Sequence, residues 1–168
     1  MTSVVDSNVI LVANRQHDGV SRDCVAACAI RLQTIMRTQR IALDADREIL
    51  REYGRKTTPN SGNRPGDAFL KWALQNNANP KKCDLVKLTP HDERVYDSFP
   101  EDARLSNFDP PDRKFVAVSA AHEDHPPILQ AADSKWIGWE SALKDHGISV
   151  EFLCPDDIRR FHDKKFPK

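Results

Sequence analysis

The sequence has no excess of either charge and no long apolar run. Lys plus Arg and Asp plus Glu both number 25, so the formal net charge is zero. No general basic field therefore attracts nucleic acid, and any polyanion must be held by local groups of cations. Because no apolar stretch approaches the ~20 residues that cross a bilayer, we expect a soluble protein without a membrane partner. Internal repeats and low-complexity tracts are also absent, which argues against a repeat architecture.

Cysteine is scarce, and its spacing is uninformative. The four cysteines, Cys24, Cys28, Cys83 and Cys154, form no CxxC pair. The chain opens directly into strand-like sequence without a charged, apolar and small-residue signal. We therefore expect reduced thiols and a cytoplasmic location. Cys24 and Cys28 lie one helical turn apart near an apolar face, which favours small buried side chains over a zinc site.

The length and composition suit one compact domain. With 168 residues and 39% hydrophobic content, the chain can build a sheet covered by helices on both faces. We expect this domain to occupy residues 1–154. Residues 155–168 should form a basic, weakly helical tail on the same domain.

Strand-like and helix-like segments alternate along most of the chain, which predicts an α/β protein with a mainly parallel sheet. Strands are expected at 2–5, 40–44, 83–88, 127–132 and 148–152. Asp6 should end the first of these strands, and an apolar stretch, Val9–Val12, continues past it. Helices are expected at 21–37, 48–56, 67–76, 112–121 and 134–147. Residues 54–66 read as a mobile, basic surface loop, and residues 89–111 as a loop with at most one helical turn.

Four acids stand where a strand ends or a helix begins: Asp6, Glu52, Asp112 and Asp133. The carboxyl ends of parallel strands and the starts of helices face the crevice in which open α/β sheets bind ligands. Carboxylates gathered there repel one another unless a hard cation such as Mg²⁺ or Mn²⁺ holds them. The sequence therefore suggests a metal pocket built by these acids.

Each acid also has a plain structural explanation. Asp6, Asp112 and Asp133 could be helix caps or turn formers. Glu52 could be an exposed partner of Lys56, although it lies at the margin of its helix's apolar face and is a better candidate than the distal Glu48. Asp109 is a further candidate ligand, because two prolines fix its separation from Asp112.

The segments VVDSNV, ILREY, DRKFVAVSAA and AADSKW resemble the successive acidic motifs of PIN-domain nucleases. This resemblance implies a three-layer α/β/α sandwich with a central parallel sheet. It also implies that Asp6, Glu52, Asp112 and Asp133 bind Mg²⁺ or Mn²⁺ and hydrolyse phosphodiester bonds, usually of RNA, leaving a 5′-phosphate. Ser7 matches the small hydroxyl residue that follows the first acid. The sequence departs from the pattern at Ala131 and Lys135, where a Thr or Ser and a further Asp are common.

The leading prediction is a metal-dependent endoribonuclease. A role as a toxin or defence effector with an inhibitory protein partner, and a homodimer, are left open. Phosphates of the RNA would be held by cations near the acids, although a solvated charged surface explains these equally: Arg55, Lys56, Arg64, Arg113, Lys114 and Lys135.

Two other functions compete with this prediction. The first is a catalytically inactive PIN-like binding module, which Ala131 and Lys135 favour. The second is a phosphatase with Asp6 as nucleophile, which Asn8 disfavours because such enzymes have a second Asp at that position. Trp72, Trp136 and Trp139 could stack on unpaired bases, but their helical spacing favours packing in the core.

Overall fold

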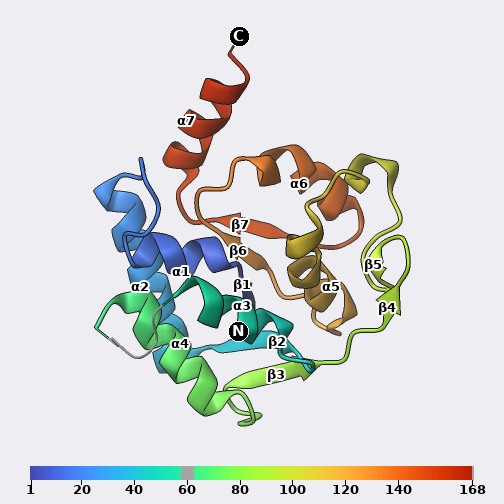
Figure 1. Cartoon of the computed structure of the whole chain (residues 1–168), viewed down its shortest axis with the longest axis horizontal. Helices are drawn as coiled ribbons and strands as arrows, with labels where there is room; N and C mark the ends of the chain where they lie inside the picture. The colour runs from blue at the N-terminus through green and yellow to red at the C-terminus, as the bar shows by residue number, and fades with distance from the viewer. Residues whose placement is uncertain (58–62, 168) are drawn as a thin grey trace.

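The computed structural model describes residues 1–57 and 63–167. Within them a five-stranded sheet has the order β3-β2-β1-β6-β7, and all its neighbouring strands are parallel (Figure 1). The strands are β1 (Thr2–Val5), β2 (Arg40–Asp44), β3 (Cys83–Val86), β6 (Ile128–Gln130) and β7 (Val150–Phe152). The helices are α1 (Ser7–Ala13), α2 (Arg22–Thr38), α3 (Glu48–Lys56), α4 (Pro65–Asn76), α5 (Arg113–Ala121), α6 (Lys135–Asp145) and α7 (Pro155–Lys165).

Helices flank the sheet, which confirms the predicted α/β/α sandwich. The central strands are buried along their length: Ser3, Val4 and Val5 in β1, and all three residues of β6. Parallel strands covered on both faces have this continuous burial. The predicted buried helix is α5, in which even Arg113 and Lys114 are buried.

The strand order reverses at β1. This strand pairs with β2 through Thr2 and Ser3 and with β6 through Val4 and Val5. Strands β2 and β3 lie on one side of β1, and strands β6 and β7 lie on the other. A topological switch point therefore lies between β1 and β6, and open α/β sheets bind ligands in the crevice at such a point.

Asp6 ends β1 as predicted, and the apolar stretch Val9–Val12 beyond it belongs to α1, a helix that the sequence did not predict. Asp6 causes the change of structure. Its side chain accepts a hydrogen bond from the backbone N–H of Asn8 at 2.8 Å, so it caps the helix directly after β1. Ser21 caps α2 as predicted, with its hydroxyl accepting from Cys24 N.

The loop at 89–111 has more structure than expected. It contains a short antiparallel pair, β4 (Pro90–His91) and β5 (Val95–Tyr96), and two 3-10 turns, η1 (Ala103–Leu105) and η2 (Pro110–Asp112). The loop predicted at 54–66 is shorter than expected, because α3 continues to Lys56 and α4 begins at Pro65. Of the remaining loop residues, 57–64, residues 58–62 fall outside the described residues.

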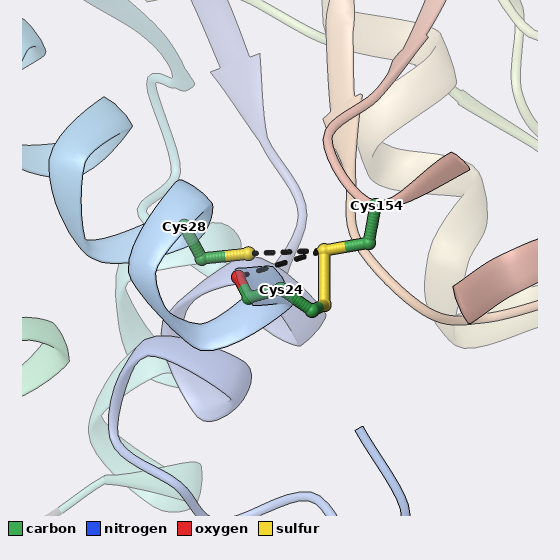
Figure 2. Close-up of side chains that lie close together, drawn as sticks. All are labelled: Cys24, Cys28 and Cys154. Carbon is green, nitrogen blue, oxygen red and sulfur yellow. Dashed lines mark hydrogen bonds between the residues drawn. A yellow bond between two sulfur atoms is a disulfide. The ribbon is translucent and has the colours of Figure 1, made fainter. Parts of the chain in front are cut away.

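The prediction of reduced thiols was wrong for one pair. Cys24 in α2 and Cys154, just before α7, form a disulfide across 130 residues of sequence (Figure 2). Local spacing gave no sign of it, because the sheet topology is what brings these residues together. Cys28 is a free, fully buried thiol, as the helical spacing predicted, and its sulfur lies 3.8 Å from that of Cys154.

The C-terminal segment is a regular helix, α7, fastened to α2 at its start. Beside the disulfide, Asp157 accepts hydrogen bonds from the backbone N–H and the hydroxyl of Ser21 at 2.6 and 2.7 Å. Arg160 donates to the carbonyl of Gly19. Because Ile158 is buried as well, the first turns of α7 belong to the folded domain.

Candidate metal centre

Three acids from two parts of the chain meet at the switch point. Asp109, Asp112 and Asp133, together called the acidic cluster, each offer one carboxylate oxygen, and these oxygens all lie within 4.8 Å of one another. Asp109 and Asp112 flank the two prolines of η2, which fix their spacing. Asp133 follows β6, so the fold brings it to them from the sheet.

Asp6 lies at the carboxyl end of β1 and is only 5% exposed. Its pKa is raised to about 8, first by burial and then by the negative charge of Asp112. Glu52 and Asp133 raise the pKa further, and the hydrogen bond from Asn8 opposes this. The negative charge of the acidic cluster therefore contributes to the raised pKa of Asp6. Among the described residues, however, Asp6 is not one of the acids whose oxygens all lie within 4.8 Å of one another.

Asp112 immediately precedes α5, but it does not act as a conventional cap. No hydrogen bond from the described residues reaches its side chain. Its pKa is raised to about 6 by burial and by the charges of Asp133, Glu52 and Asp109, while Lys56 opposes the rise. Its two oxygens are consequently available to a ligand, and the capping explanation for this acid is not supported.

Asp133 has both a structural and a potential ligand role. One of its oxygens accepts a hydrogen bond from the backbone N–H of Lys135 at 3.1 Å, at the start of α6. The capping interpretation thus accounts for part of its position. One oxygen of Asp133 is still part of the acidic cluster. Both roles are possible because the segment after β6 leads into α6 and also lies beside Asp109 and Asp112.

Glu52 is buried, as its place on the margin of the apolar face predicted. It accepts hydrogen bonds from the Ser7 hydroxyl and from Lys114 Nζ, the latter at 2.8 Å, and Lys56 Nζ lies 3.9 Å away. Glu48, the less favoured acid, is instead paired with Arg51 on the surface. Glu52 thus belongs to a buried network beside the acidic cluster and is not a member of it.

Asn8 is a residue whose role the sequence did not reveal. Its side-chain oxygen accepts from the backbone N–H of Ala132 at 2.6 Å, and its own backbone N–H donates to Asp6. This bridge joins the ends of β1 and β6 across the switch point. A polar side chain following a strand-terminal Asp was the available signal, but its partner lies 124 residues away.

The predicted phosphate-binding cations have different surroundings. Lys135 donates to Asp109 at 2.8 Å, and this hydrogen bond raises the pKa of the lysine. Arg113 is buried, donates to the carbonyls of Phe108 and Ser106 and stacks on a phenyl ring. It therefore holds the segment before α5, and we leave it out of the proposed substrate contacts.

The remaining cations of the predicted set lie on the α3 and α4 side. Arg64 Nε is 2.8 Å from an oxygen of Asp67. Arg55 is exposed at the end of α3, and Lys56 lies near Glu52. The structure thus brings Lys56 and Lys135 to the acids and gives Arg64 a local partner.

The donor set suits a hard divalent cation. Carboxylate oxygens are the ligands that Mg²⁺ and Mn²⁺ prefer, and three of them converge here from rigid supports. The pKa values of Asp6 and Asp112 are raised first by burial and then by neighbouring negative charge, and a bound cation would offset that charge. The residues therefore fit such an ion.

Two further observations bear on function. In the part of the chain that the structure describes, no helix has the length and apolar character needed to span a bilayer. No family model matches the chain, and comparisons with curated proteins and with solved structures also give no match.

Proposed function

We propose that this protein is a metal-dependent phosphodiester hydrolase of the PIN-like type, with RNA as its substrate. The observation that carries the proposal is the convergence of Asp109, Asp112 and Asp133 at the switch point, beside the buried Asp6. Two separate elements, η2 and the end of β6, bring these acids together. Helix caps without a common function would not need to lie so close to one another.

The side chains have two roles in this proposal: some would bind the ion, and others would position the groups around it. Asp109, Asp112 and Asp133 would hold Mg²⁺ or Mn²⁺, with Asp6 behind them. When bound, such an ion lowers the pKa of a water ligand and offsets negative charge that develops on the phosphate. Lys114 and Ser7 fix the carboxylate of Glu52, and this carboxylate would orient a water molecule next to the acids.

The test is cleavage of labelled single-stranded RNA and DNA by purified protein, with Mn²⁺ or with a chelator. We expect cleavage of RNA that requires Mn²⁺ and is reduced at least ~100-fold in Asp112→Asn and Asp133→Asn. Asp46→Asn is the matched control, because Asp46 is an exposed acid outside the site. Equal cleavage by Asp133→Asn and wild type would sink the proposal.

One observation favours the alternative of a binding module without activity. The ammonium of Lys135 occupies an oxygen of Asp109, at the position where the family resemblance expects another acid. A lysine there competes with a cation for that oxygen. Binding of RNA without cleavage at any Mn²⁺ concentration would support this alternative. The phosphatase is the weaker alternative, because Asp6 is 5% exposed and caps α1.

The resemblance supports a toxin or defence effector with an inhibitory protein partner, and the cytoplasmic location is proposed from the cysteine spacing. A homodimer stays open. The Cys24–Cys154 disulfide points instead toward an oxidising compartment. Thiol labelling of protein taken directly from cells decides between the two, because cytoplasmic protein should carry four reactive thiols after denaturation.

A further inference from the structure

A pocket of about 600 Å³ lies between the segment before α5, the start of α6 and the end of α7. Residues from all three line it: Arg104, Asp109, Lys135, Trp139, Lys165 and Phe166. Small-ligand sites commonly have volumes of about 300–1,000 Å³, so the pocket has room for a nucleotide. Its third wall depends on α7, the helix fastened by the disulfide.

The pocket is continuous with the acidic cluster. Asp109 belongs to both, and the ion pair between Asp109 and Lys135 marks their boundary. A strand whose phosphate lay at the acids would therefore place a neighbouring nucleotide in this pocket.

The cations of the pocket differ in whether a carboxylate already neutralises their charge. Arg104 is paired with Asp102 and Asp145 at 2.7 and 2.9 Å, and Lys135 with Asp109. Lys165, in contrast, forms no ion pair with any residue that the structure describes. Its ammonium is thus the cation best able to bind a phosphate of the strand.

The next residue in the chain, Phe166, also lines the pocket with an aromatic ring. Phe166 is 66% exposed, and its centroid lies 5.0 Å from that of the His162 ring. Trp139 is nearly buried and donates its indole N–H to Asn107, so its ring forms a wall of the pocket. Phe166 is therefore the aromatic ring of the pocket that is exposed to a base. Exposed rings beside cations are the usual platform for unpaired bases.

We propose that this pocket is a subsite for one unpaired nucleotide of single-stranded RNA, with the base stacked on Phe166 and a phosphate bound by Lys165. The inference rests on the proposed function, since it names how that site holds its substrate. Single strands are favoured over duplexes because stacking on Phe166 requires an open base face. Net neutrality of the chain agrees with such local holding.

The experiment measures binding of a labelled ten-nucleotide oligouridine by fluorescence anisotropy with the full chain. Two conditions prevent cleavage: chelator, and an Asp133→Asn background with Mg²⁺. We expect Phe166→Ala to weaken binding about tenfold, since stacking contributes ~1–3 kcal/mol per base, and Phe166→Tyr to retain it. Lys165→Gln should lower the salt dependence of binding by about 0.7 in slope.

Lys164→Gln is the matched control. Lys164 and Lys165 are adjacent and exposed, and only Lys165 lines the pocket. Equal effects of the two substitutions would overturn the subsite, because they would show a general charge effect. Unchanged binding by Phe166→Ala, equal affinity for duplex RNA, or no binding of oligouridine in either condition would overturn it as well.

The subsite and the nuclease can fail separately. If wild type cleaves RNA with Mn²⁺ but Phe166→Ala binds normally, the subsite is wrong and the proposed function stands. If nothing is cleaved yet Phe166 and Lys165 govern binding, the subsite stands and the hydrolase is wrong.

Discussion

The ammonium of Lys114 lies 2.8 Å from Oε1 of Glu52, and both side chains are buried beside the acidic cluster. The two residues are separated by 62 positions, one on α5 and the other on α3. Lys114 also donates to the carbonyl of Pro111, so it connects Glu52 with the turn that carries Asp109 and Asp112. A buried pair of this kind is costly to break, because either partner left alone is an uncompensated charge.

Lys114→Met should therefore destabilise the protein by about 3 kcal/mol, because it leaves Glu52 buried without its main counter-charge. Urea unfolding followed by circular dichroism measures the change. Adding Glu52→Gln to Lys114→Met should recover a large part of the loss. Additive destabilisation by the two substitutions would contradict the pairing. Lys71→Met, on the exposed face of α4, is the control and should be nearly neutral.

Asp6 should make the metal-free protein less stable as the pH rises. Its pKa is about 8 in the folded state, compared with an ordinary value of 3.8. Between these values the folded state holds a proton that the unfolded state has released, so the free energy of unfolding falls with rising pH. Asp6→Asn removes the part of this dependence that comes from Asp6, whereas the part from Asp112, whose pKa is about 6, remains.

The measurement is the melting temperature of wild type and Asp6→Asn in chelator from pH 4 to pH 9. The variant should melt at least ~3 °C higher at pH 8, with the difference vanishing near pH 4. The same pH dependence of the melting temperature in wild type and Asp6→Asn would show that Asp6 is not held in its neutral form.

Lys135→Gln should strengthen Mn²⁺ binding. The substitution releases the Asp109 oxygen that now accepts from the ammonium at 2.8 Å. An exposed pair contributes up to ~1 kcal/mol, so we expect up to about a fivefold lower Kd by isothermal titration calorimetry. Lys144→Gln on the same helix is the control. Weaker Mn²⁺ binding by Lys135→Gln would mean that Asp109 is not a ligand.

The Cys24–Cys154 disulfide should account for part of the stability. Cys154→Ser should lower the free energy of unfolding by about 2–4 kcal/mol, because the disulfide restricts the unfolded chain. Wild type should lose a similar amount in dithiothreitol, whereas the variant should not respond to it. Cys83→Ser, which removes a free buried thiol, should leave the response to dithiothreitol unchanged.

Much of the fold followed from local pattern. The β-branched run at 2–5, the helical spacing behind Ser21 and the apolar segment at 112–121 form the predicted elements to within one residue. No helix was predicted over Val9–Val12, since a short apolar run fits a strand or a buried helix equally well. The capping bond from Asp6 decided between them.

The candidate site was predictable as a set of positions but not as a geometry. Asp112 and Asp133 could be named because they stand at element boundaries, and Glu52 because of its helical phase. The separate roles of Asp6 and Glu52 could not, because they depend on which neighbours desolvate or pair with each carboxylate.

By itself, the sequence determined the order of strands and helices and put acids at their ends, because periodicity and capping act over a few residues. Only the tertiary structure decided that Asp109 pairs with Lys135, that Glu52 is held by Lys114, and that Cys24 meets Cys154 across 130 residues. Contacts of this range depend on which strand lies beside which. That order is set by packing of the whole sheet, and no local segment encodes it.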